Sequence, residues 1–143
     1  MRKSGQTLFE LVIAVGVAVL VVTGIVALVT LSLRNSGFAR DQALATRYAQ
    51  DALEWLRSER DNGWNTFYSR TTISTWCLNS LGWTSPGSCG SNKITGTKFG
   101  RQAEFSVIDA NSVNAQVRVS WTDSQGTHQS KIDTVLVNQK TNP

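Results

Sequence analysis

The sequence predicts an α+β protein in which a long N-terminal α-helix precedes a small C-terminal antiparallel β-sheet. Two observations carry this prediction. An uncharged apolar run from Leu11 to Leu33 leads into an amphipathic helical pattern, and apolar and polar residues alternate in the last third of the chain. The length of 143 residues excludes a large multidomain enzyme. With 2 prolines and 11 glycines, the composition argues against collagen and extended disorder.

The apolar run is long enough to cross a membrane, because about 20 apolar residues span a bilayer as a helix. Arg2 and Lys3 precede the run, so the positive-inside rule keeps the N-terminus in the cytoplasm and places the rest outside. A cleaved secretory signal would have a shorter apolar core followed by a small-x-small cleavage site, and Leu31–Arg34 offers no such site. A single-pass membrane protein is therefore expected.

Glu10 stands at the start of this run, where a carboxylate costs free energy beside hydrocarbon. One explanation is local. Thr7 and Glu10 match the T-x-x-E capping box, in which the two side chains satisfy free amides at a helix start. On that interpretation Glu10 also interacts favourably with the positive end of the helix dipole.

A second explanation comes from a resemblance. The segment Ser4–Leu11 (SGQTLFEL), behind a basic head and before a long apolar run, resembles the N-terminal signal of the type IV pilin superfamily. The resemblance implies that a prepilin peptidase removes residues 1–5 by cutting after Gly5. Gln6 then becomes the first mature residue and the N-methylated one, and Glu10 acts in assembly. Gln6 replaces the commoner Phe or Met, and the run lacks the proline found in many major pilins.

A physical argument supports a role for Glu10 in assembly. Apolar contacts alone let bundled helices slip, whereas one buried charge that must find an opposite charge fixes a single offset. We expect the Glu10 carboxylate to pair with the new amine of Gln6 in an adjacent subunit. The partners that the resemblance implies are other pilin subunits, the prepilin peptidase and the assembly platform in the membrane. Assembly would move the chain from the cytoplasmic membrane to an extracellular or periplasmic filament.

Residues 6–34 are thus expected to form the transmembrane or filament-core helix, and residues 35–62 its amphipathic half. Small and apolar residues fall close to one face of the second half, with Tyr48 and Trp55 flanking it. Asp61–Gly63 ends the pattern. The face is expected to comprise Phe38, Ala45, Ala49, Ala52 and Leu56. The stretch from Ala43 to Trp64 is also similar to minor pilins of the pilus-modification (PilV-like) type, and Trp64 is expected to pack the head onto the helix.

Residues 63–143 are expected to form a globular head. Cys77 and Cys89 enclose eleven residues, and an even cysteine count in an exported chain predicts a disulfide; two free buried thiols are the alternative. Trp83, between them, either is exposed to a partner or folds back on the head. Short strands are expected at 71–76 and 94–99.

Three further strands form the clearest pattern. Residues 103–107 and 115–122 alternate apolar with polar side chains, residues 109–114 connect them, and a turn at 123–126 leads to a strand at 131–137. An antiparallel sheet with one apolar face would lie on the amphipathic half of the helix. The tail from Asn138 to Pro143 is expected to fray.

No motif for enzymatic chemistry occurs, so we expect no catalysis and no cofactor. One His and two Cys nearly exclude a four-ligand metal site, and Asp109, Asp123 and Asp133 follow no EF-hand pattern; a calcium site built from loops stays open. His128 is expected to be a solvated turn residue.

Three functions are compatible with the sequence. The first is a structural subunit, a minor pilin or pseudopilin, of a type IV pilus-like filament. The second is a tip module that binds DNA or a surface ligand weakly, and the third is an anchored exported protein unrelated to filaments. The second would use basic and aromatic residues of the head. These are Arg70, Lys93, Lys98, Arg101, Trp76, Trp83 and Phe99. The sequence chooses neither between a major and a minor subunit nor between pilus, type II secretion and competence systems.

Overall fold

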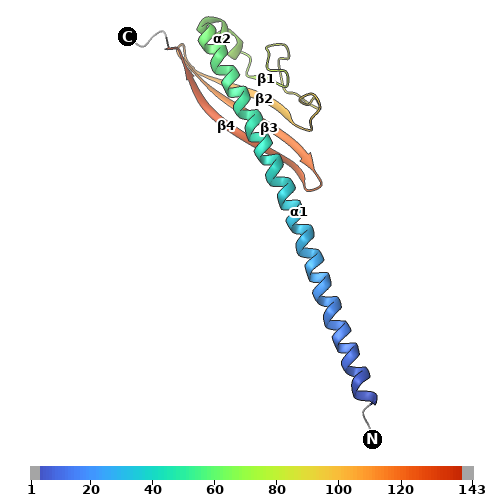
Figure 1. The fold of residues 1–143 in the computed structure, drawn as a ribbon. Helices are drawn as coiled ribbons and strands as arrows, with labels where there is room; N and C mark the ends of the chain where they lie inside the picture. The colour runs from blue at the N-terminus through green and yellow to red at the C-terminus, as the bar shows by residue number, and fades with distance from the viewer. Residues whose placement is uncertain (1–3, 140–143) are drawn as a thin grey trace. The chain divides into compact units, whose positions relative to one another are not determined.

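The structure, a computed structural model, describes residues 4–139, with side chains from residue 7 onward. It confirms the α+β class (Figure 1). The elements in chain order are α1 (Ser4–Asn62), α2 (Trp64–Thr71), β1 (Thr75–Cys77), β2 (Gly100–Asp109), β3 (Ser112–Asp123) and β4 (Gly126–Val137). The chain divides into two compact units, Met1–Arg40 and Asp41–Pro143.

The described part of the first unit is helical throughout. Its residues are mostly Leu, Val, Ala and Ile, and it contains no proline that would remove a helix hydrogen bond. Gly16 and Gly24 lie within the helix, and a Cβ added at either would meet nothing within 4 Å. The helix begins at Ser4, so Thr7 lies one turn inside it. The capping-box interpretation, which needs Thr7 at the N-cap, is therefore wrong.

The second unit holds a four-stranded antiparallel sheet in the order β1-β2-β3-β4. The three predicted consecutive strands are confirmed, and each is longer than the alternation indicated. The predicted connection at 109–114 shortens to a tight turn at Ala110 and Asn111, because Ser112 already pairs with Asp109. Two-residue connections of this kind join antiparallel strands directly.

The core of the second unit lies between the sheet and the part of α1 that follows Asp41. Every second residue of β3, from Val113 to Trp121, is buried on the face that meets the helix. Ala45, Ala49 and Ala52 are fully buried, and their small side chains let the helix approach the sheet closely. Leu53, Leu56 and Leu136 complete this contact. Phe38, expected on the same face, is instead 43% exposed.

The segment between α1 and β2 departs most from the expectation. α2 was not predicted, because it is only eight residues long and its N-cap, Gly63, has no side chain that could mark a helix start. The strand expected at 71–76 is reduced to β1 at Thr75–Cys77. The strand expected at 94–99 is wrong. Ile94 N donates to Phe99 O and Thr97 N to Ile94 O, and Gly96 has a φ of +74°, so this segment is a closed turn.

Candidate functional site

The apolar half of α1 presents its side chains outward on every side. The large apolar residues from Leu8 to Leu33 are all at least half exposed, from 50% at Ile13 to 74% at Leu20. By length and composition this helix can cross a membrane. The run from Leu11 to Leu33 rises by about 35 Å at 1.5 Å per residue, slightly more than the roughly 30 Å of bilayer hydrocarbon. An exposed apolar surface of this kind needs an apolar environment.

The two threonine hydroxyls within the run are satisfied by the helix itself. The Thr30 hydroxyl donates to Val26 O at 2.8 Å, and the Thr23 hydroxyl donates to Val19 O. Each bond reaches back one turn, so neither hydroxyl needs a partner outside the helix. These two residues therefore add little polarity to the exposed surface of α1.

Glu10 is exposed in the first turns of α1, immediately before the uncharged run. Gly5 and Gln6, the residues of the predicted cleavage, belong to the helical backbone, but the side chain of Gln6 lies outside what the structure describes. Residues 1–3 of the predicted leader lie outside them as well, so the leader and the Glu10 pairing stay predictions. What the structure does establish is that the carboxylate is exposed on the helix where the uncharged apolar surface begins.

The predicted disulfide is present. Cys77, at the end of β1, bonds to Cys89 with a Cα–Cα distance of 4.7 Å. The loop that it closes folds back onto β1. Cys77 N donates to Ser85 O at 2.9 Å, and Gly87 N donates to Thr75 O at 2.8 Å. The segment Ser85–Gly87 therefore occupies the outer edge of β1, where Pro86 pairs with Trp76.

Trp83, near the middle of this loop, folds back on the head. Its ring lies 4.9 Å from that of Trp55 and 5.1 Å from that of Trp76, measured between centroids. Its Nε1 donates to Glu59 Oε2 at 2.7 Å. Trp64 is buried as expected, and its Nε1 donates to Ala110 O at 2.9 Å. Both indoles have their polar atom satisfied, so they act in packing.

Arg101 has a structural role that the sequence did not predict. It is only 4% exposed, and its guanidinium donates to the carbonyls of Leu78 at 2.9 Å and Tyr48 at 3.0 Å, with a longer bond of 3.4 Å to Asn79. It thereby ties the disulfide loop to α1. Burial lowers the pKa of Arg101, while the negative charge of Asp51 opposes that effect.

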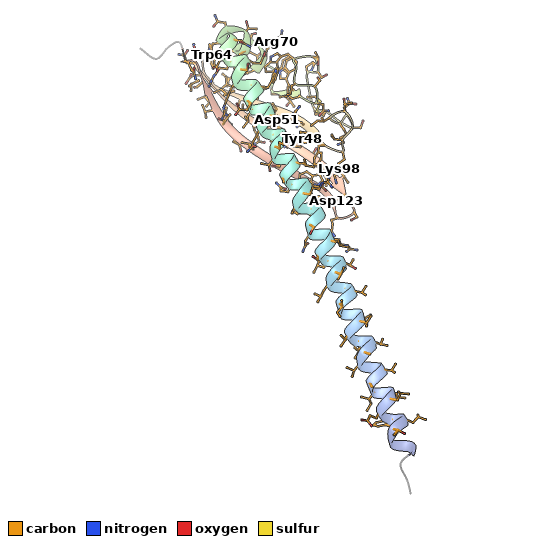
Figure 2. The ribbon with its side chains drawn as sticks, in the orientation of Figure 1. Tyr48, Asp51, Trp64, Arg70, Lys98 and Asp123 are labelled. Atoms are coloured by element: carbon orange, nitrogen blue, oxygen red, sulfur yellow. A yellow bond between two sulfur atoms is a disulfide. The ribbon has the colours of Figure 1, made fainter. Side chains whose placement is uncertain are left out.

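The proposed basic and aromatic patch does not form as a surface. Trp76 and Phe99 are buried at 2% and 3% exposure, and Arg101 is inside the head. Lys98 pairs with Asp41, the Nζ–Oδ2 distance being 2.5 Å. Arg70 and Lys93 are exposed. Figure 2 shows Arg70 and Lys98 at well-separated places on the head. The basic and aromatic residues that were expected to form one surface are instead divided between the core and the exterior of the head.

Polar residues of the sheet pair with one another. His128 is half-buried rather than solvated, and its Nε2 lies 3.0 Å from Asp123 Oδ1. Hydrogen bonds from Gln125 N and His128 lower the pKa of Asp123. Asp133 accepts from Gln116 at 2.7 Å. A hydrogen bond from Ser112 and the amide of Asn111 lower the pKa of Asp109. No group of three metal-ligating side chains occurs among the residues described.

Comparison with known proteins assigns the chain to no family. No protein-family model matches the chain, and neither the curated proteins nor the solved structures contain a match. The fold is nevertheless pilin-like, because a long apolar N-terminal helix continues into a segment that packs on a small antiparallel sheet.

Proposed function

We propose that this chain is a structural subunit, a minor pilin or pseudopilin, of a bacterial type IV pilus-like filament. Prepilin peptidase cuts it after Gly5, Gln6 is N-methylated, and the apolar half of α1 enters the filament core with Glu10 setting the register. The observation that carries the proposal is the exposed helical surface from Leu11 to Leu33, with one carboxylate at its start and a pilin-like head after it.

The physical reason is the cost of an unpaired carboxylate. Glu10 is the only acidic residue before Asp41. When copies of α1 pack together, a carboxylate without a counter-charge is strongly destabilising, and pairing with the amine of a neighbour removes that penalty at one offset only. A membrane anchor with no assembly role has no need of this residue.

The first experiment is N-terminal sequencing of the exported chain from cells with and without prepilin peptidase. We expect the mature chain to begin at N-methylated Gln6, and the enzyme-deficient strain to retain Arg2 and Lys3. A mature chain that keeps the basic head and stays singly dispersed in the membrane would instead support an anchored protein unrelated to filaments.

The second experiment tests Glu10 directly. Glu10→Gln removes only the charge, and we expect incorporation into filaments to fall about tenfold or more. Thr30→Val is the matched control, because that hydroxyl bonds only its own helix at Val26 O, and its incorporation should equal that of the parent. Equal incorporation of Glu10→Gln would exclude the register role. The alternative tip-binding function has less support, since three of its seven proposed residues are buried.

A further inference from the structure

The two edges of the sheet differ in whether another segment of the chain pairs with them. At β1 the edge is closed, because the segment Ser85–Gly87 supplies its hydrogen bonds. At the other edge β4 pairs with β3 along its whole length, from Gly126 to Val137, without a bulge or a proline. No further strand follows β4 in the sheet formed by the described residues. Proteins normally protect a long, regular edge of this kind, because it offers a template for another chain.

A groove runs beside this open edge, between β4 and α1. Its volume is about 470 Å³, and its lining consists of Gln50, Asp51, Leu53, Glu54, Arg57 and Ile132. Among the residues that line this α1–β4 groove, Arg57 pairs with Glu54 at 3.0 Å, and the carboxylate of Asp51 interacts with the positive charge of the buried Arg101. Asp51 is exposed on α1, as Figure 2 shows. The groove thus combines apolar side chains, Leu53 and Ile132, with a rim that carries two carboxylates and one guanidinium.

The opposite side of the head carries the opposite charge. No acidic residue occurs between Asp61 and Glu104, whereas four basic residues do. Of these, Arg101 is buried and Lys98 pairs with Asp41. Lys93 lies exposed in the loop Gly90–Lys98, called here the basic loop, which leads into β2. Figure 1 shows the β1–β2 connection on the side of the sheet away from β4.

We propose that heads of successive copies of this chain join side by side, with the basic loop of one copy lying along the β4 edge and α1–β4 groove of the next. Lys93 then faces Asp51 and Glu54 of the neighbour. This inference rests on the proposed filament function and names the head contact within it. A heterologous contact of this type does not close on itself, so it propagates along a filament.

The direction of β4 distinguishes this contact from the simplest alternative, in which the β4 edges of two copies pair with each other. β4 runs in the same direction as the helix beside it, since Thr46 contacts Ser130 and Gly63 shares a hollow with Asn138. Antiparallel pairing of two β4 edges, in the register centred on Ile132, would bring Lys131 opposite Asp133 of a second copy and make the two heads antiparallel. A filament with one polarity excludes that arrangement, whereas the contact between basic loop and groove preserves it.

The test uses the full chain in isolated filaments or bilayer vesicles. An equal mixture of ¹⁴N- and ¹⁵N-labelled chains is treated with a carbodiimide, which joins a lysine amine to a carboxylate as an amide with loss of water. We expect mixed-isotope peptides that link Lys93 to Asp51 or Glu54. The bond between Lys98 and Asp41 provides an internal control, because its peptides should carry a single isotope.

A charge reversal sharpens the result. Lys93→Glu removes the reactive amine, so the mixed-isotope links at this pair should disappear whether or not the contact forms. The double variant Lys93→Glu with Glu54→Lys places an amine and a carboxylate on exchanged sides of the contact, and it should restore much of the yield only if the two positions face each other. Mixed-isotope links between Lys131 and Asp133, or no link between chains, would overturn the proposal. N-terminal sequencing and Glu10→Gln incorporation are scored on the same preparations. Filaments that begin at Gln6 but lack the Lys93 link would reject only the head contact.

Discussion

At the scale of single residues, Arg101 illustrates a charge that is buried without a direct ion pair. Its guanidinium donates to carbonyls of the disulfide loop and of α1, and a fixed planar group can hold both segments at once. A basic residue in this setting contributes to folding rather than to ligand binding, which is why it does not belong to a surface patch.

Arg101→Met should lower the free energy of unfolding by about 2–4 kcal/mol, because the side chain keeps its bulk while the carbonyls of Leu78 and Tyr48 lose their donor. Urea unfolding followed by tryptophan fluorescence measures this change. Arg70→Met, at an exposed position, should alter the same quantity by less than about 0.5 kcal/mol. Equal effects of both variants would contradict the assigned role.

Asp123 gives the β3–β4 turn a dependence on pH. Bonds from Gln125 N and His128 hold the pKa of its carboxyl below the unfolded value. The ionised group therefore stabilises the folded turn above the ordinary aspartate range near pH 4, and this stabilisation is lost as the pH falls through the folded pKa. The protection factor of the Gln125 amide, which is the ratio of its intrinsic to its observed exchange rate, should fall over that range. Asp123→Asn keeps an acceptor but should abolish the pH dependence of this protection factor; an unchanged profile would disprove the assignment.

At the scale of elements, the disulfide loop closes one edge of the sheet and supplies packing groups to the core. Its eleven enclosed residues include Leu78 and Trp83, which contact the helix side of the head. The edge hydrogen bonds, from Cys77 N to Ser85 O and from Gly87 N to Thr75 O, depend on the loop returning to β1. The cross-link therefore fixes both a sheet edge and an aromatic cluster.

Replacing Cys77 and Cys89 together by Ser should lower the free energy of unfolding by about 3 kcal/mol, the value expected for a loop of this size. Thermal unfolding of the exported protein under oxidising conditions tests this. The parent should show an intact mass lower by two hydrogens than the reduced chain. Alkylation of two thiols in the parent without reductant would refute the cross-link.

At the scale of the whole molecule, the core belongs entirely to the second unit. Its buried apolar residues begin at Ala45, and no side chain before Asp41 belongs to it among the residues described. The two units therefore have separate roles in the chain. One provides an apolar surface, and the other provides a folded head.

A fragment of residues 35–143 should consequently unfold within about 1 kcal/mol of the full chain in detergent, because it keeps the entire core. A fragment of residues 57–143 lacks Ala45 to Leu56 and should not fold, since burial of these side chains is lost. Circular dichroism and urea titration distinguish the two. Failure of the longer fragment to fold would show that the apolar segment contributes to the stability of the head.

The sequence was informative where one physical pattern dominated. Alternation from Val113 to Trp121 identified β3, since a half-buried strand requires that period, and the spacing of Ala45, Ala49 and Ala52 identified the packed helix face. Prediction from the sequence failed where contacts between residues far apart in the chain determine burial or conformation. Arg101 is buried because distant carbonyls meet it, and residues 94–99 turn because Gly96 permits a positive φ. Neither cause is visible in local periodicity.

The outward-facing apolar half of α1 has a consequence for the thermodynamics of the proposed assembly. Lipid tails and the aliphatic interior of a helix bundle are nearly equivalent solvents for Leu and Val, so exchanging one for the other gains little hydrophobic free energy. Withdrawal from the bilayer is then close to neutral for these side chains. The direction and reversibility of assembly must therefore depend on other contributions. These are the few polar groups whose free energy differs between the bilayer and the helix bundle, and the work done on the chain.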